Sequence, residues 1–148
     1  MILWRISNHA DLSGEGGMRA SARWHTIGKP VVYLADSAAA ALLEVLVHFE
    51  LDELPASYQL LSVQADDEIA FETPANLPAA WATDEEATRE IGDEWLREGR
   101  TALLRVPSTI VPDTWNWLLN PRHDDAPRLR ITSVQKQPFD PRLVRRRE

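Results

Sequence analysis

The sequence predicts an α+β fold. Several short apolar runs bounded by Gly, Pro or polar clusters indicate strands, and two longer runs preceded by capping residues indicate helices. These elements do not alternate regularly, as they would in a doubly wound parallel sheet. The chain has 148 residues, of which 44% are hydrophobic and 26% are charged. This size and composition are typical of one globular domain, which we expect over residues 1–148.

The expected strands are short, and most are closed by a turn signal. Residues 31–35 follow Gly28-Lys29-Pro30, and residues 102–106 precede Pro107-Ser108. The full set of expected strands is residues 2–6, 31–35, 58–65, 70–73, 102–106 and 129–137. We expect the Gly-rich residues 13–17 to form a loop, and residues 115–119 to form a helical turn closed by Asn120-Pro121.

Two segments have helix start signals. Asp36 or Ser37 is positioned to cap a helix that runs through residue 50. Thr83 and Glu86 have the spacing of a capping box ahead of a second helix, which Gly99 ends.

The bulk composition excludes several classes of function. The chain has no cysteine, so disulfides and thiolate catalysis are ruled out. A net charge of −7 disfavours a nucleic-acid partner, because such binding depends on Lys and Arg at phosphates. The N-terminal residues fit neither a signal peptide nor a membrane span, so we expect a cytoplasmic protein. The basic cluster of Arg142 and residues 145–147 is expected to be a solvated tail with no catalytic role.

The first expected helix has one face of small residues with a single carboxylate in its middle. At 100° per residue, this face is shared by Ser37, Ala40, Ala41, Glu44 and His48. The opposite face, where we expect a core, consists of Leu42, Val45, Leu46 and Phe49. Small side chains let a ligand approach the helix closely, so this face is a candidate ligand floor around Glu44. The alternative is that Glu44 faces solvent and pairs with His48 four residues later.

The loop before residue 31 is a candidate anion cradle. It carries Arg19, Arg23 and Lys29 among glycines in an otherwise acidic protein. It matches neither the dinucleotide fingerprint, because Arg19 replaces the third glycine, nor a P-loop. The alternative is an ordinary surface loop with solvated arginines. No G-x-S-x-G motif occurs, so a serine hydrolase has no local support. The histidines lack the spacing of a zinc-binding helix, and we expect no metal.

Several ordered blocks of the chain resemble the RES domain. The blocks are R-I near the start, A-R-W-H, G-K-P-V-V-Y-L-A, A-L-L-E-V-L-V-H, V-P-S-T-I-V-P, N-W-L-L-N-P-R-H and F-D-P-R-L. The resemblance runs from Trp4 to Leu143. The family is named for an Arg, a Glu and a Ser, which match Arg23, Glu44 and Ser108 here, and its functional tyrosine matches Tyr33. This sequence departs at Ala22 and His25, where the family usually has glycine and asparagine, so the loop conformation is in question.

The resemblance implies a fold similar to the ADP-ribosyltransferases, with a mixed sheet core and flanking helices. It also implies a toxin that is paired with an Xre-type antitoxin and consumes NAD⁺ as a substrate, with no cofactor. Known members cleave NAD⁺ with water or inorganic phosphate as acceptor, and some transfer ADP-ribose to a protein. The resemblance does not separate these acceptors. A non-catalytic binding module is the alternative from another class, and acidity argues against a ribonuclease.

Under this resemblance, each site residue has an expected role. Glu44 would stabilise the positive charge that develops on the ribose, as carboxylates do in glycoside hydrolysis. Arg23 would bind the pyrophosphate through paired hydrogen bonds, and Tyr33 would pack on the nicotinamide ring. Further NAD⁺ contacts are expected from Ser108, to the ribose or carboxamide, and from Arg5 and Lys29.

Overall fold

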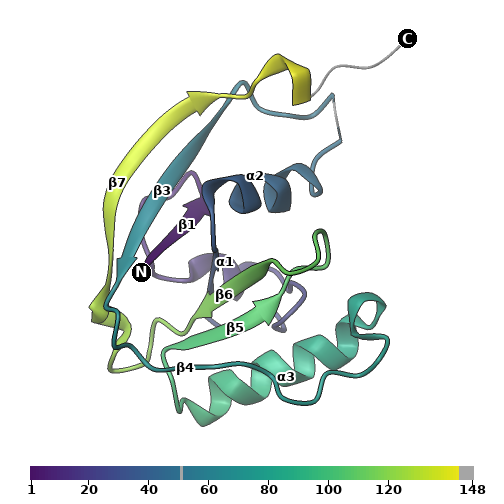
Figure 1. Ribbon diagram of the computed structural model, residues 1–148, viewed down its shortest axis with the longest axis vertical. Coiled ribbons are helices and arrows are strands. Elements are labelled where there is room, and N and C mark those ends of the chain that lie inside the picture. The colour runs from purple at the N-terminus through teal and green to yellow at the C-terminus, as the bar shows by residue number, and fades with distance from the viewer. Residues whose placement is uncertain (51, 144–148) are drawn as a thin grey trace.

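The computed structural model describes residues 1–50 and 52–143, and its centre is a seven-stranded sheet (Figure 1). The strand order is β4-β5-β6-β2-β1-β3-β7, and all neighbours pair antiparallel except β4 and β5. The strands are β1 (Ile2–Ile6), β2 (Val32–Ala35), β3 (Ser57–Ala65), β4 (Phe71–Glu72), β5 (Leu103–Pro107), β6 (Trp115–Leu119) and β7 (Leu129–Pro138). The predicted α+β class with a mixed sheet is confirmed.

The helices lie against different parts of this sheet. They are α1 (Glu15–Arg19), α2 (Ala38–Leu46) and α3 (Glu85–Glu98), with short 3₁₀ turns η1 (Trp81–Thr83), η2 (Ala126–Arg128) and η3 (Pro141–Leu143). Helix α3 lies along the end of the sheet formed by β4, β5 and β6, whereas α2 packs on β1 and β2 (Figure 1). No helix within the described ranges is both long and apolar enough to cross a bilayer.

The helix caps follow the sequence closely. The Ser37 hydroxyl accepts a hydrogen bond from the amide of Ala40, as predicted for the start of α2. Gly99 ends α3 in the left-handed conformation that glycine adopts without strain. The predicted Thr83 cap was wrong, because the Asp84 side chain caps α3 and Thr83 belongs to the preceding turn.

Two further predictions need correction. Residues 115–119 form strand β6 instead of a helical turn, because they pair along their whole length with β2 on one side and β5 on the other. Part of the predicted 13–17 loop is the short helix α1. The arginines at positions 145–147 of the predicted basic tail lie outside the described residues.

Helix α2 packs with the opposite face to the one predicted as its core face. Its small residues Ala40 and Ala41 are buried against Ala35. The residues predicted to face the core are less buried: Phe49 is exposed, and Leu42, Val45 and Leu46 are half-buried. The helix also ends at Leu46, short of the predicted residue 50. Alanines bring the helix backbone close to β1 and β2, and this packing decides where Glu44 projects.

Candidate active site

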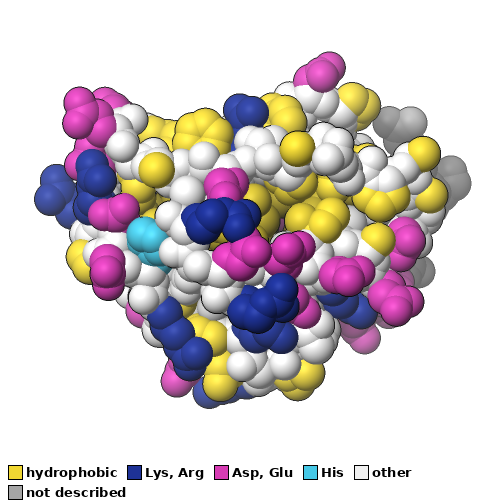
Figure 2. Space-filling model, turned by 90° about the horizontal axis from the view of Figure 1, so that it is seen from below, with side chains coloured by type: hydrophobic (Ala, Val, Ile, Leu, Met, Phe, Trp, Pro, Cys, Tyr) yellow, Lys and Arg dark blue, Asp and Glu magenta, His cyan; other side chains and the backbone are white. Residues whose placement is uncertain are grey.

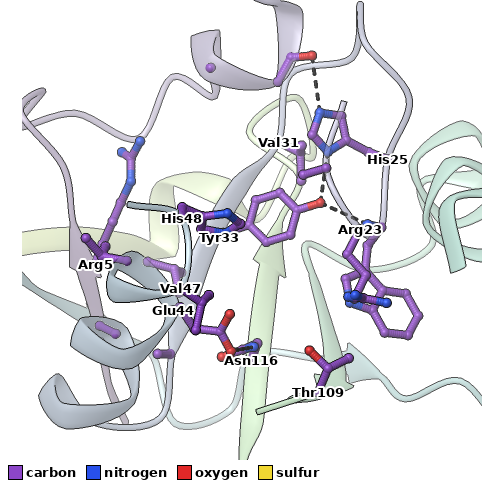
Figure 3. A pocket seen from close by; sticks show the side chains of 18 of the residues that line it. Arg5, Arg23, His25, Val31, Tyr33, Glu44, Val47, His48, Thr109 and Asn116 are labelled. Atoms are coloured by element: carbon purple, nitrogen blue, oxygen red, sulfur yellow. Dashed lines mark hydrogen bonds between the residues drawn. The ribbon is translucent and has the colours of Figure 1, made fainter. Parts of the chain in front are cut away.

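A pocket of about 580 Å³ lies between α2, β2 and the loop that follows α1 (Figure 3). Four of the predicted site residues line it: Arg5, Arg23, Tyr33 and Glu44. In Figure 3, the Tyr33 ring lies between Arg5 and Arg23, and Glu44 and Asn116 lie below it. Residues 39 positions apart in the sequence, from Arg5 to Glu44, therefore share one concave surface.

The Glu44 carboxylate is held by two neutral donors. Its Oε1 accepts a hydrogen bond from Ser108 Oγ at 3.0 Å and one from Asn116 Nδ2 at 2.7 Å. Ser108 is buried directly after β5, and its Oγ also accepts the amide hydrogen of Ile110, at 3.1 Å. The Ser108 hydroxyl hydrogen is thereby directed at Glu44.

Glu44 does not pair with His48, which was the alternative prediction. Among residues 1–50 and 52–143, no nitrogen of Lys, Arg or His lies within 4.0 Å of its carboxylate. Hydrogen bonds from neutral groups orient a carboxylate while leaving its negative charge uncompensated. The arrangement therefore presents an oriented anion to the pocket.

Sequence reasoning missed Asn116, whereas Ser108 lies close to Glu44 as predicted. Asn116 was assigned to a helical turn, but as part of a strand it alternates with Trp115 and Trp117 and faces the pocket side. Ser108 does not line the pocket, and it contacts Glu44 from behind instead. The alternation of large and polar residues in W-N-W was the available signal for Asn116.

The Tyr33 ring enters the pocket from β2, and its hydroxyl is tied to the loop after α1. The Trp24 amide donates to the Tyr33 oxygen at 3.2 Å, and His25 Nδ1 lies 2.8 Å from the same oxygen. Burial raises the pKa of Tyr33 well above its usual range, so the hydroxyl stays protonated at neutral pH.

Helix α3 holds the backbone of the Arg23 loop. Thr88 Oγ1 donates to the Arg23 carbonyl at 2.6 Å, and Arg89 Nε donates to the Ala22 carbonyl at 2.7 Å. A Cβ at Gly92 would lie 1.6 Å from the Trp24 carbonyl oxygen, so only glycine permits this approach. The loop therefore takes its shape from contacts with a helix some 60 residues later in the chain.

The two departures from the family pattern fit this loop. Ala22 and His25 form an isolated antiparallel bridge, in which the Ala22 amide donates to the His25 carbonyl at 3.1 Å. Within the described residues, Asp113 is the only non-glycine residue with positive φ, so Ala22 needs no conformation reserved for glycine. Alanine is thus accommodated without backbone strain.

The Arg23 side chain is partly neutralised. It donates to the Ala82 carbonyl at 3.0 Å, and it lies 3.6 Å from Glu85, which also pairs with Arg89. Its side chain is 27% exposed. The guanidinium therefore faces the pocket with part of its charge already compensated.

The remaining predicted cations are divided between the pocket and the surface. Arg5 lines the pocket, and its guanidinium donates to the Asp11 carbonyl. Lys29 does not line the pocket and pairs with Asp93 at 3.6 Å. Arg19, another arginine of the predicted cradle, points to solvent and pairs with Glu15. The structure therefore brings two of the four cations into the pocket.

The charges on the surface are mixed. On the face shown in Figure 2, Lys and Arg side chains are interspersed with Asp and Glu, and no broad basic area is visible. Within the described ranges, no group of three His, Asp or Glu side chains is placed to hold a metal ion. The charged groups that line the pocket are instead two carboxylates, of Glu44 and Glu85, and three guanidiniums, of Arg5, Arg23 and Arg89.

Comparison with known proteins identifies the family. The RES domain profile matches residues 2–142. The chain is 45% identical over 143 residues to Toxin Res of Pseudomonas putida (strain KT2440), covering 95% of this chain and 97% of that protein. It is 39% identical over 155 residues to the Prs ADP-ribosylating toxin of Sphingobium sp. (strain YBL2), covering 97% of this chain and 96% of that protein.

A solved structure shares the fold. The crystal structure of the M. tuberculosis MbcT–MbcA toxin–antitoxin complex contains a chain that matches with a TM-score of 0.71 and 22% identity. The match covers 97% of this chain and 86% of that one. Sequence and fold agree over nearly the whole chain, which therefore belongs to the RES domain family of toxins.

Proposed function

We propose that this protein is an enzyme that cleaves the bond between nicotinamide and ribose in NAD⁺. The observation that carries this proposal is the Glu44 carboxylate, which is oriented by two neutral donors in a pocket shared with the Tyr33 ring and the predicted arginines Arg5 and Arg23. An uncompensated anion is suited to a reaction in which positive charge develops beside it.

In this mechanism, the C1′–N bond breaks and its electron pair leaves with nicotinamide, which departs as a neutral molecule. The ribose becomes oxocarbenium-like, and Glu44 stabilises its positive charge. Water attacks C1′ and releases a proton, giving ADP-ribose, or inorganic phosphate attacks and gives ADP-ribose 1′-phosphate. The protein groups act by position and charge, with NAD⁺ consumed as substrate and no cofactor in the step.

The other pocket residues bind the two ends of the substrate. The guanidinium of Arg23 holds the pyrophosphate through charge-assisted hydrogen bonds, and Arg5 adds a second cation. The ring of Tyr33 packs on nicotinamide and orients the bond that breaks. This division places the anionic part of NAD⁺ at the arginines and its reacting carbon beside Glu44.

Transfer of ADP-ribose to a protein is the second candidate. A relative that is 39% identical bears the name Prs ADP-ribosylating toxin. Cleavage of the same bond serves this reaction, and only the acceptor differs. A non-catalytic module is less well supported, because the three residues expected to act together do line one pocket.

We also propose that an Xre-type antitoxin binds this toxin and covers the pocket. The fold neighbour was solved as a toxin–antitoxin complex, which supports a partner of this kind. A host whose cytoplasmic NAD⁺ is consumed needs such a partner to survive. Coexpression of a neighbouring antitoxin gene should restore growth, and failure to bind or rescue would contradict the pairing.

The decisive experiment mixes purified protein with NAD⁺, with and without inorganic phosphate, and separates the products by chromatography with mass detection. Nicotinamide with ADP-ribose indicates hydrolysis, and nicotinamide with ADP-ribose 1′-phosphate indicates phosphorolysis. A parallel reaction with bacterial extract tests for ADP-ribose attached to a protein. If no nicotinamide forms under any of these conditions, the proposed function is wrong.

A further inference from the structure

We propose that His25 is a positioning residue that locks Tyr33, so that Tyr33 offers the substrate its ring face and not its hydroxyl. The inference rests on the proposed function and assigns a role to a residue at which this chain departs from its family's pattern. His25 is 2% exposed and hydrogen-bonds through both ring nitrogens.

The partners of His25 determine which ring nitrogen carries the hydrogen. Nε2 lies 2.9 Å from the Ala20 carbonyl oxygen and 3.3 Å from the Gly17 carbonyl oxygen. Both of these atoms only accept hydrogen bonds, so Nε2 is the protonated nitrogen. Burial lowers the pKa of His25, which keeps the ring neutral near pH 7. Nδ1 therefore carries a lone pair and accepts a hydrogen bond.

This tautomer determines how the Tyr33 hydroxyl is used. The Tyr33 O–H donates to His25 Nδ1 across 2.8 Å, and the oxygen accepts the Trp24 amide hydrogen at 3.2 Å. The single donor of the phenol is consumed, and an acceptor site is occupied. Since its pKa is also raised by burial, Tyr33 is a poor proton donor or acceptor for the reaction. What remains available to the pocket is its ring.

The charged neighbours do not oppose this assignment. Asp93 acts to raise the pKa of His25 and Lys29 acts to lower it, and these two side chains form an ion pair with each other at 3.6 Å. Their effects on His25 therefore partly cancel, and burial dominates. The result is a neutral chain of hydrogen bonds from the end of α1, through His25, to the tip of Tyr33.

Two substitutions separate the two contacts of His25. In His25→Asn, the side-chain oxygen reaches the position of Nδ1, so the bond from Tyr33 is kept and the bond to Ala20 is lost. In His25→Gln, the side-chain nitrogen reaches the position of Nε2, so the opposite holds. We expect His25→Asn to stay within about threefold of wild type in kcat/KM, and His25→Gln to lose about tenfold, the value of one hydrogen bond.

A purely structural role predicts a different result, because each variant loses one hydrogen bond and both should then lose activity in step with their thermal stability. Equal losses in the two variants, with wild type releasing nicotinamide, would overturn the role of His25 alone. A wild-type protein that releases no nicotinamide would overturn the proposed function instead.

The ring-face role has its own test. Tyr33→Phe keeps the ring and removes the hydroxyl, whereas Tyr33→Leu removes both. We expect nicotinamide release by the Phe variant within about tenfold of wild type, since only one or two neutral hydrogen bonds are lost, and a much lower rate for the Leu variant. If the Phe variant is as slow as the Leu variant, the hydroxyl is the functional group, and if both variants stay near wild type, neither group is needed. Either result would overturn the inference.

The tautomer can be measured without any activity. Long-range ¹H–¹⁵N correlation spectra of the four histidines at pH 7 should include a signal with a protonated Nε2 and an unprotonated Nδ1 that vanishes in His25→Asn. The variant His9→Gln, at an exposed position outside the pocket, is the matched control for assignment. A hydrogen on Nδ1 of His25 would overturn the proposed chain.

Discussion

The two walls of the pocket hold opposite charges in different ways. On one wall, Glu44 of α2 is oriented by Ser108 and Asn116, two neutral donors from the sheet. On the other wall, Arg23 stands on a loop clamped by α3 and lies beside the carboxylate of Glu85. Among residues 1–50 and 52–143, Glu44 thus has no cationic partner, whereas Arg23 is partly compensated before any substrate arrives.

Under the proposed function, this difference assigns the chemical step to the Glu44 wall and substrate binding to the Arg23 wall. A carboxylate that must stabilise a transient positive charge is more effective with no cation nearby. A neighbouring cation would neutralise its charge in the ground state and weaken its interaction with the transition state. An arginine that binds a pyrophosphate can exchange a weak, half-exposed partner for a stronger one. The following predictions test this division, in order of decreasing effect.

The largest expected effect is that of Glu44→Gln. Glutamine keeps the size of the side chain and removes the charge, so kcat should fall by about 10²–10³ with little change in NAD⁺ affinity. Nicotinamide release and NAD⁺ titration measure the two quantities. The matched control is Glu90→Gln at an exposed position of α3, which should retain full activity. Near-normal release by the Glu44→Gln variant would end the proposed role of this carboxylate.

The variant Arg23→Lys should be impaired mainly in binding. Lysine keeps the charge but cannot form the paired hydrogen bonds, so we expect KM for NAD⁺ to rise by about tenfold or more. The same exchange at Arg19, which points to solvent from the end of α1, should leave KM unchanged. A fall in kcat with unchanged KM would assign Arg23 to the chemical step instead.

Ser108→Ala should lower kcat through Glu44, because Ser108 itself does not line the pocket. The hydroxyl donates to Glu44 from behind the pocket, so its loss should lower kcat by about threefold to tenfold and leave KM unchanged. Steady-state kinetics separate the two parameters. If KM rises and kcat does not change, Ser108 contacts the substrate directly, as the sequence had suggested.

Glu85→Gln should have a smaller effect of the opposite sign. Removing the charge beside Arg23 frees the guanidinium for an anionic ligand, and the value of such a half-exposed pair is at most about 1 kcal/mol. KM for NAD⁺ should therefore fall by no more than about fivefold, and the effect should shrink as salt is added. An increase in KM would mean that Glu85 helps to hold Arg23 in place.

The smallest expected effect is on the pH dependence of the free energy of unfolding, through His25. Its pKa in the folded protein is lowered from the usual 6.5, so below about pH 6.5 the unfolded chain binds a proton that the folded chain does not. This contribution to stability is complete above pH 6.5 and is lost as the pH falls toward the folded pKa. Urea unfolding at pH 7.5 and 5.5 should show a smaller difference for His25→Asn than for wild type.

Much of the fold was predictable because it depends on local signals. Ser37 and Gly99 begin and end helices through contacts with residues three or four positions away. Residues 115–119 were not predictable in the same way, because a short apolar run fits a strand or a helix equally well. Pairing with β2 and β5 settles the question, and Asn116 was missed for this reason.

The packing face of α2 was predicted wrongly for a related reason. A helical wheel shows which residues share a face, but it does not show which face meets the sheet. Large residues were assumed to be buried, yet close approach to β1 and β2 requires the alanines.

The sequence by itself determined the α+β class, the helix caps and, through its ordered blocks, the residues Arg23, Tyr33 and Glu44. Only the tertiary structure decided what those residues touch. Ser108 and Asn116 reach Glu44 across 64 and 72 positions of the chain, and Thr88 reaches the Arg23 loop across 65. Contacts at such separations depend on how strands pair and helices pack. Local sequence patterns do not determine strand pairing or helix packing, because both bring together residues far apart in the chain.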